Sequence, residues 1–582
     1  MSFFAFLTGY SSSQDSLDRR LVYSLSTRKV PTGGQLRHLK KFLNPREYLI
    51  LKICSTVLVL GVIYFGFIFF KNNLEYYPSF GGSYVEGVVG YPKSINPLYS
   101  VGRDVDADLS RLIYSSLFKY DINGVIVPDL VSEMIISEDG KEYTLKIKNN
   151  AVWHNGERLT VEDVVYTVET IQNQAFHSPL RASLSLAVVE KVDDETIKFK
   201  LSEAYSPFLD ILTFGIMPKR LWETVSADSV LLSDLNLKPV GSGPYKFKSL
   251  TRTTSGDLKD YVLEVNPGYY GQVPYIEELS FRFYPNIEEA VKALNSKQVS
   301  GLSYLPFGWK DELLTQNSLK FLELRQARLV SIFFNQAKNT ALADKETRVA
   351  LALALDKAEL IKNALGEANL VVDGPILPSN WAYNSAITVY GYNQDGAREK
   401  LSSGPLNISL TVVDSGSNVV LAEEVKKYWE AAGAVVSLRI ISGEQAADVV
   451  KSRDFEALIY GQFIGGDPDL YSFWHSSQAG SAGLNISDYK NDEVDKLLID
   501  GRTVVSEEKR KEIYYKFQEI ISADLPAIFL YSPAYTYVQG GKLQGFFSRA
   551  IISPSDRFAG ISGWYLKTGT RFFDRSEEQD NN

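Results

Sequence analysis

Cysteine and histidine are scarce in this chain, and several motifs of catalysis are missing. The 582 residues include one cysteine, Cys54, so no disulfide can form within the chain. There are four histidines, and no H-E-x-x-H, paired-histidine or C-x-x-C spacing occurs. A G-x-x-x-x-G-K-[ST] phosphate loop and a G-x-S-x-G nucleophile elbow are also missing. These absences argue against a zinc enzyme, a P-loop nucleotide-binding protein and a serine hydrolase of the elbow type.

The composition is typical of a large globular protein with an acidic body. A hydrophobic content of 45% predicts folded cores rather than disorder, and 582 residues suffice for two to four domains. Residues 1–52 hold nine Lys/Arg and three acidic residues, so the net charge of −9 arises in the rest of the chain. An acidic body argues against nucleic-acid binding as the main role.

One hydrophobic run predicts a membrane-spanning helix. Residues 53–70, ICSTVLVLGVIYFGFIFF, carry no charge, and as a helix they extend roughly 27 Å, close to the ~30 Å hydrocarbon core of a bilayer. Basic residues gather on the N-terminal side: Arg37, Lys40, Lys41, Arg46 and Lys52. By the positive-inside rule, we expect residues 1–52 in the cytoplasm and the main body outside, in the periplasm or at the cell surface.

A cleaved signal peptide is the alternative interpretation of this run. The apolar part of a signal usually has about 7–15 residues and ends at small residues, whereas this run is longer and continues as FIFFKNNLEYYP. Cys54 begins the run instead of following it, which argues against a lipoprotein. We therefore expect a retained anchor, with residues 71–78 as a short tether.

The stretch WHNGERLTVEDVVYTVE (153–169) raises the question of a catalytic or metal site, because it concentrates His154, Glu157, Glu162 and Asp163. The surrounding pattern predicts a strand over 141–148, a tight turn at Asn155-Gly156 and an amphipathic helix after Thr160. Thr160 and Asp163 fit a capping box, and carboxylates are favourable in a first helical turn. We interpret the stretch as scaffold.

Strand and helix patterns alternate along the body. Residues 407–441 predict a strand, a helix and a strand, which implies a parallel pair with a right-handed crossover. Long amphipathic helices are expected over 346–365 and 507–521. Such alternation favours an α/β body.

Six stretches, in order, resemble the family-5 extracellular solute-binding proteins, the oligopeptide- and dipeptide-binding components of ABC importers. They are GGSYVEGVVGYPKSINPLYS (81–100), YTLKIKNNAVWHNGERLTVEDVVYTVE (143–169), PVGSGPYKF (239–247), FFNQAKNTALADKETRVALALALDKAELI (333–361), GGDPDLYSFWHSSQ (465–478) and DLPAIFLY (524–531). Each stretch alone is a weak signal, and six in the right order cover nearly the whole body.

The resemblance implies a bilobal α/β flytrap, periplasmic-binding-protein-like (type II), with an inserted subdomain and a preceding transmembrane helix. The expected division is a basic head at 1–52, the helix at 53–70, the tether at 71–78, lobe I at 79–113 plus 238–328 plus 537–572, the insertion at 114–237, lobe II at 329–536 and a polar tail at 573–582. Two hydrophobic crossing strands would form the hinge, and closure around a ligand would follow.

The resemblance also implies the function. It predicts a membrane-anchored receptor, not an enzyme, which takes peptides in an interlobe cleft and delivers them to an ABC permease whose ATPase subunits are separate chains. No metal and no cofactor are expected. The alternative is a surface sensor built on the same flytrap and not coupled to import, for which the cytoplasmic head would be the supporting feature.

Candidate ligand-binding residues are those on crossing segments and strand ends: Asn96, Tyr114, Tyr304, Asn335, Gln462, Phe463, Asp467 and Trp474. Aromatic side chains offer contact area at low entropy cost, and each of these residues could equally belong to a core. The chain departs from well-known peptide binders, which carry an aspartate shortly before the D-P pair to bind the ligand's ammonium. Here Phe463 and Ile464 stand there, so longer, more apolar peptides or another ligand are also open. The Asp467/Asp469 pair is interpreted as shaping a turn.

Overall fold

The computed structural model describes residues 43–313, 318–402, 404, 406–414, 417–481, 483–548 and 550–572. Most of the expected cytoplasmic head and the expected tail at 573–582 lie outside these residues. The chain divides into two compact units, one made of residues 1–77 and 568–582 and the other of residues 78–567. Each unit is described by itself.

The first unit contains a long apolar helix, α4 (Pro45–Asn72). It begins eight residues before the apolar run, because Asn44 and Glu47 form a capping box and Pro45 occupies the first turn. Within the described residues, α4 alone has the length and composition to cross a membrane, with a mean hydropathy of 2.4 over its most apolar window and no part of that window buried. Residues of the expected tether form β1 (Leu74–Ser79), which pairs with β22 (Lys567–Phe572).

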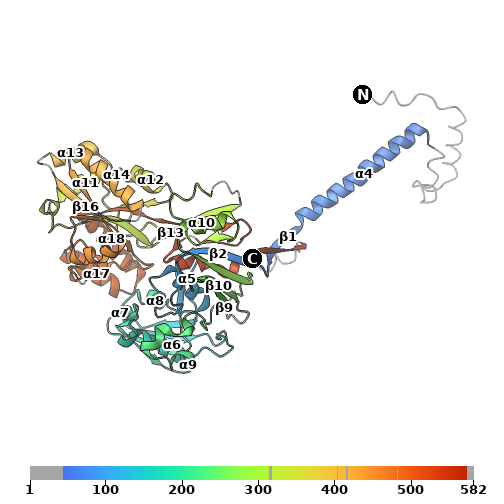
Figure 1. The fold of residues 1–582 in the computed structure, drawn as a ribbon, viewed down its shortest axis with the longest axis horizontal. Coiled ribbons are helices and arrows are strands. Elements are labelled where there is room, and N and C mark those ends of the chain that lie inside the picture. Colours follow the sequence, from blue (N-terminus) through green and yellow to red (C-terminus); the bar gives the residue numbers. More distant parts are fainter. Residues whose placement is uncertain are drawn as a thin grey trace. The chain divides into compact units, whose positions relative to one another are not determined.

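The second unit contains an eight-stranded sheet assembled from distant parts of the chain. Its order is β21-β13-β20-β12-β2-β11-β10-β9. The strands are β2 (Ser83–Val89), β9 (Tyr245–Arg252), β10 (Leu258–Val265), β11 (Glu278–Tyr284), β12 (Gly301–Leu302), β13 (Leu319–Gln326), β20 (Ala534–Gly540) and β21 (Ala550–Ile551). Helices α5 (Asp104–Ile113) and α10 (Ile287–Asn295) pack against this sheet (Figure 1).

A six-stranded mixed sheet, in the order β15-β19-β14-β18-β16-β17, is buried on both faces. Its strands are β14 (Arg328–Phe334), β15 (Leu370–Val371), β16 (Asn407–Val413), β17 (Val435–Ile441), β18 (Ala457–Phe463) and β19 (Ala527–Ser532). The expected parallel crossover over 407–441 is confirmed, because β16 pairs with β17 in parallel register. Alternate residues of β14 enter two different cores, Ile332 on one face and Phe333 on the other.

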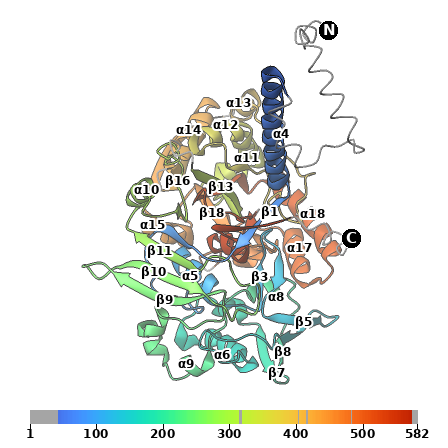
Figure 2. The same cartoon turned by 90° about the vertical axis from the view of Figure 1, so that its right-hand side faces the viewer.

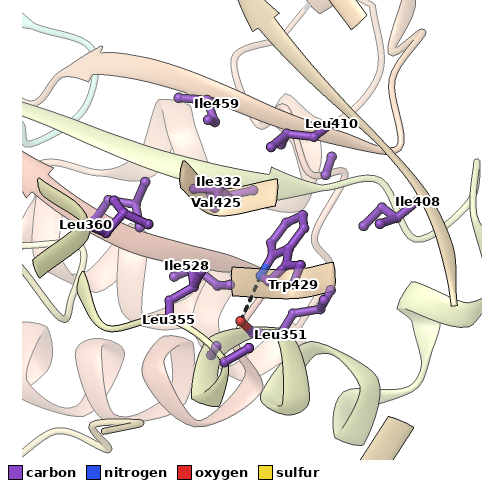
Figure 3. Packing of buried hydrophobic residues seen from close by; sticks show 14 of the residues in the cluster. Ile332, Leu351, Leu355, Leu360, Ile408, Leu410, Val425, Trp429, Ile459 and Ile528 are labelled. Carbon is purple, nitrogen blue, oxygen red and sulfur yellow. Dashed lines mark hydrogen bonds between the residues drawn. The ribbon is translucent and has the colours of Figure 1, made fainter. Parts of the chain in front are cut away.

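Helices cover both faces of this sheet (Figure 1). They are α11 (Lys345–Leu353), α12 (Lys357–Leu365), α13 (Gln394–Leu401), α14 (Ser417–Ala431), α15 (Gly443–Ser452), α16 (Tyr471–Trp474), α17 (Asp492–Thr503) and α18 (Glu507–Asp524). The single helix expected over 346–365 is wrong in one respect: it is two helices, because the Asp356 side chain accepts the Glu359 N–H at 3.1 Å and caps a new one. Trp429 of α14 fills the core, and its Nε1 donates to Leu351 O at 3.0 Å (Figure 3).

Residues 118–222 form a smaller antiparallel layer (Figure 2). Its four-stranded sheet has the order β5-β6-β8-β7, and α6 packs on β7 and β8. The elements are β3 (Phe118–Tyr120), β4 (Ile126–Pro128), β5 (Val131–Ile136), β6 (Glu142–Ile147), α6 (Val161–Gln172), α7 (Arg181–Leu184), β7 (Ala187–Lys191), β8 (Thr196–Leu201), α8 (Phe208–Ile211) and α9 (Lys219–Trp222).

The stretch at 153–163 is part of this scaffold. The Thr160/Asp163 capping box forms, with Thr160 N donating to Asp163 Oδ2 at 2.8 Å. His154 Nδ1 accepts the Gly241 N–H at 3.2 Å, which leaves the ring proton on Nε2 facing Gly243 O. Burial lowers the pKa of His154 to about 4, so the ring is neutral. Both ring nitrogens are bound to backbone groups of the turn at 241–243, so the role of His154 is structural.

The turn that contacts His154 also lies against the end of α5, and this second contact requires glycine at position 241. A Cβ at position 241 would lie 1.9 Å from Ile113 O, so only glycine lets the 241–243 turn approach the end of α5. The stretches 143–169 and 239–247, both part of the family resemblance, pack on each other through the hydrogen bonds of His154.

Candidate functional site

A cavity with a volume of about 650 Å³ lies where the eight-stranded sheet, the six-stranded sheet and the small layer of the second unit meet. That is within the ordinary range for ligand sites, roughly 300–1,000 Å³. Four segments line it: residues 97–120, residues 180–215, residues 463–484 and residues 552–556. The first and last flank the eight-stranded sheet, the second belongs to the small layer, and the third follows β18 of the six-stranded sheet.

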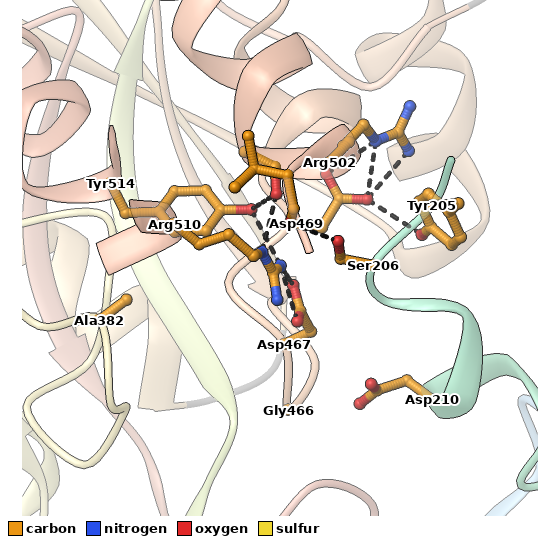
Figure 4. Close-up of polar contacts among 12 residues, drawn as sticks. Tyr205, Ser206, Asp210, Ala382, Gly466, Asp467, Asp469, Arg502, Arg510 and Tyr514 are labelled. Carbon is orange, nitrogen blue, oxygen red and sulfur yellow. Dashed lines mark hydrogen bonds and ion pairs between the residues drawn. The ribbon is translucent and has the colours of Figure 1, made fainter. Parts of the chain in front are cut away.

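Two aspartates of the loop after β18 are neutralised by arginines (Figure 4). Arg510 of α18 donates from Nη2 to both carboxylate oxygens of Asp467, at 2.6 and 2.8 Å, and from Nε to Gly501 O at 2.8 Å. Both side chains are almost fully buried, with exposed fractions of 7% and 12%. Burial raises the pKa of Asp467 to about 6, while its bonds with Arg510 act in the opposite direction. Arg502 of α17 binds Asp469 in the same way, with Nε 2.9 and 3.0 Å from the two oxygens.

The same loop and α17 contact the small layer (Figure 4). Tyr205 donates its hydroxyl to Asp469 Oδ2 at 3.0 Å, and burial raises the pKa of Tyr205, so the hydroxyl stays protonated. Ser206 donates from its backbone N to Arg502 O at 2.7 Å and from Oγ to Val504 O at 2.6 Å. We call these hydrogen bonds the bridging contact. They join segments on two sides of the cavity.

Two other carboxylates of the cavity lack an ion-pair partner within the described residues. Asp210 accepts a hydrogen bond from the Tyr120 hydroxyl at 2.6 Å, and burial raises the pKa of Asp210. Asp104 stands at the start of α5 and is exposed. The cavity therefore holds negative charge that a cationic group can balance. In the described part of the chain, no group of three or more His, Cys, Asp or Glu side chains is placed to hold a metal ion.

Three of the expected ligand-binding residues line the cavity. They are Tyr114, which is buried, Asp467, which pairs with Arg510, and Phe463, whose exposed fraction is 56%. Tyr304 is also exposed and its ring lies 5.1 Å from that of Tyr535.

The other four expected residues are buried in packing contacts. Asn96 donates from Nδ2 to Asn236 Oδ1 at 3.1 Å, and Asn335 donates from Nδ2 to Arg453 O at 2.8 Å. Trp474 packs in the core of the six-stranded sheet, and Gln462 lies within β18. That any of the eight residues touches a ligand stays a prediction.

Sequence reasoning missed most of the polar residues around the cavity: Tyr120, Tyr205, Asp210, Arg502 and Arg510. Asp467 and Asp469 were noticed and correctly placed in a shaped loop. Their arginine partners stand 43 and 33 positions later, on helices whose local pattern marks only an amphipathic surface. No short-range signal reveals such pairs.

The comparisons with known proteins agree with this architecture. Residues 125–483, more than half of the chain, match the family model described as bacterial extracellular solute-binding proteins, family 5, middle. The oligopeptide-binding protein AppA of Bacillus subtilis is 28% identical over 521 residues, which span 84% of this chain and 92% of that protein.

Solved structures match over the same extent. The crystal structure of the ABC transporter substrate-binding protein CtaP from Listeria monocytogenes superposes with a TM-score of 0.75 at 26% identity, covering 84% of this chain and all of that one. AppA of Bacillus subtilis in complex with a nonapeptide gives a TM-score of 0.67 at 26% identity, with the same coverage. The expected bilobal α/β fold of type II periplasmic binding proteins is confirmed. The chain belongs to the bacterial extracellular solute-binding proteins of family 5.

Proposed function

We propose that this protein captures peptides in the 650 Å³ cavity and delivers them to an ABC-type permease. The observation that carries the proposal is the match, over 84% of this chain, to an oligopeptide-binding protein solved with a bound nonapeptide. The family consists of binding proteins, and the cavity carboxylates then serve recognition, not catalysis. The permease and its ATPases are separate chains in this proposal, and the protein needs no cofactor.

We further propose that the two large sheets are the cores of lobes I and II and move about two one-residue hinges. Only Ala327 separates β13 of one sheet from β14 of the other, and only Pro533 separates β19 from β20. The two crossings lie side by side, because Ser532 Oγ donates to Gln326 O at 3.0 Å. This geometry supports a hinge between the lobes. With the hinge at Pro533, we propose that lobe II ends at residue 532 instead of 536. The proposed bounds of the insertion, 114–237, stay the same.

The proposal places α4 in the membrane as a retained anchor, with the N-terminus in the cytoplasm and the body outside. Support comes from its apolar surface and from the basic residues before it. Alkaline carbonate extraction of membranes checks this: an anchored chain stays in the pellet, and a chain freed by cleavage after α4 appears in the soluble fraction.

Native mass spectrometry of the full chain in detergent micelles tests peptide capture. A ladder of peptide masses after purification, or after incubation with a peptide pool, is the expected result. Ala107→Trp, which fills the cavity from α5, should lose these masses. A single non-peptide mass, or a metal, would overturn the peptide assignment. Delivery is checked by uptake of a labelled peptide in cells with and without the gene.

A further inference from the structure

Arg328 is a charged side chain at the hinge that no described residue pairs with. It is the first residue of β14, directly after the hinge residue Ala327, and its backbone pairs with Phe463 of β18. Its side chain lies across β18 at Gly461, since a Cβ at position 461 would stand 2.8 Å from both Nε and Nη2. Glycine at that position therefore keeps the guanidinium in place against the strand.

The guanidinium has no hydrogen bond or ion pair to the described residues. Its Nε is buried and makes no hydrogen bond. A charge that is taken out of water is costly unless it is paired, and the planar fork of arginine fits a carboxylate with two parallel hydrogen bonds. Arg502 and Arg510, on helices α17 and α18, each have such a carboxylate. Among the described residues neither Arg328 nor Arg103 of the cavity wall has an ion-pair partner, and of these two Arg328 has the buried guanidinium nitrogen, whereas Arg103 is exposed.

The surroundings of Arg328 are suited to a ligand. The guanidinium carbon lies 5.4 Å from the ring centre of Phe463, which lines the cavity and is largely exposed. Burial raises the pKa of the Tyr304 hydroxyl and of the Tyr531 hydroxyl. In both cases the positive charge of Arg328 acts in the opposite direction and lowers the pKa. The Phe463 ring thus lies beside a cation that has no ion pair among the described residues, and the charge of this cation acts on two tyrosine hydroxyls.

The charge of Arg328 also acts on the carboxylate of Asp104. Desolvation raises the pKa of Asp104 in the cavity, and the charges of Arg557 and Arg328 oppose it. Asp104 nevertheless forms no ion pair among the described residues, so the two charges are left available for opposite ends of a ligand.

We propose that Arg328 is the carboxylate-recognising group of the cleft: it binds a carboxylate of the captured peptide, with the Phe463 ring beside the bound group. This inference rests on the proposed peptide capture and names the chemistry of one subsite. The carboxylate can be the C-terminus of the peptide or an acidic side chain. Because Arg328 adjoins Ala327, a ligand bound there spans the hinge and favours the closed lobes.

The test is a competition between peptide pools on the full chain in detergent micelles. The first pair is a pentapeptide pool of uncharged residues with free C-termini, mixed with an equal amount of its C-terminally amidated form. The second pair is amidated throughout and carries either one Glu or one Gln. Bound peptides are released and counted by liquid chromatography and mass spectrometry, for wild type and for Arg328→Met, Arg328→Lys and Arg103→Met.

Arg103 is the control, because it is an exposed arginine in the wall of the cavity itself, whereas Arg328 reaches the cavity through its contact with Phe463. Arg328→Met keeps the aliphatic stem and removes no described hydrogen bond, so the fold should persist, as an unchanged melting temperature without peptide will show.

We expect wild type to enrich the acid over its neutral form by roughly 10- to 100-fold in at least one pair, the range of a hydrogen bond to a charged group. Enrichment in the first pair identifies the C-terminus, and enrichment in the second identifies an acidic side chain. Arg328→Met should bring the ratio close to one, Arg328→Lys should restore part of it, and Arg103→Met should leave it unchanged.

The inference is overturned if both forms are bound equally by wild type, or if Arg103→Met and not Arg328→Met removes the preference. If wild type retains none of the pools, the proposed peptide capture itself fails, which is a different result from loss of preference.

Discussion

The bridging contact between the insertion and lobe II should stabilise the closed form of the protein. Ser206→Ala removes the hydrogen bond from Oγ to Val504 O, at 2.6 Å, and Ser206 is not among the residues described as lining the cavity. Tyr205→Phe removes the hydrogen bond from the hydroxyl to the Asp469 carboxylate, at 3.0 Å. Each bond joins a residue of the insertion to a residue of lobe II. We therefore expect both bonds to form only when the lobes are together.

The expected magnitude follows from these two bonds. A neutral hydrogen bond contributes about 1 kcal/mol net, and a bond to a charged group about 1.5–3 kcal/mol. Ser206→Ala should therefore lower the ratio of closed to open protein about 5-fold, and the double variant Tyr205→Phe/Ser206→Ala, which loses about 2.5–4 kcal/mol, roughly 70- to 900-fold. Asp469 stays paired with Arg502 in both variants, so neither leaves a buried charge without a partner.

Single-molecule fluorescence transfer measures this ratio. Dyes on Glu223→Cys in the insertion and Glu423→Cys in lobe II, both exposed positions, report the distance in a Cys54→Ser background. Ser226→Ala, which removes an exposed hydroxyl elsewhere in the insertion, is the control. If the double variant shows the same distance distribution as this control, with and without a peptide pool, the bridging contact does not hold the lobes together and the reasoning is refuted.

Three other perturbations test the scaffold. Burial lowers the pKa of His154 to about 4 from 6.5, so between these values the unfolded chain binds more protons; stability should fall by about 3 kcal/mol as the pH drops from 6.5 to 4, and urea unfolding of His154→Gln should lack this component. Asp467→Asn leaves the buried charge of Arg510 without its carboxylate and should cost about 3–5 kcal/mol, whereas Asp467→Leu/Arg510→Met should recover most of that loss; equal melting temperatures for the two variants would contradict it. Trp429→Ala opens a cavity in the core of Figure 3 and should cost about 3–5 kcal/mol in urea unfolding, while a loss below 1 kcal/mol would mean that this core collapses around the gap.

The sequence by itself determined those features that depend on neighbours along the chain. The capping box at Thr160 and Asp163 needs three residues of separation, and the turn at Gly156 has the left-handed backbone that Asn-Gly predicts, with φ at 86°. The parallel pair over 407–441 follows from a strand–helix–strand pattern, and the apolar helix follows from an uninterrupted run. The family resemblance supplied the bilobal fold because six such local stretches occur in the right order.

Only the tertiary structure decided which polar residues meet. Tyr205 and Asp469 are 264 positions apart, and their hydrogen bond depends on how the insertion packs on lobe II. Trp474 and Phe463 look alike as candidates in the sequence, yet Trp474 at the end of α16 fills a core and Phe463 at the end of β18 faces the cavity. The sequence likewise cannot show that Arg328 has no ion-pair partner among the described residues, because a missing partner is a property of the whole arrangement. Local patterns fix the elements, while long-range packing fixes the charges that a ligand meets.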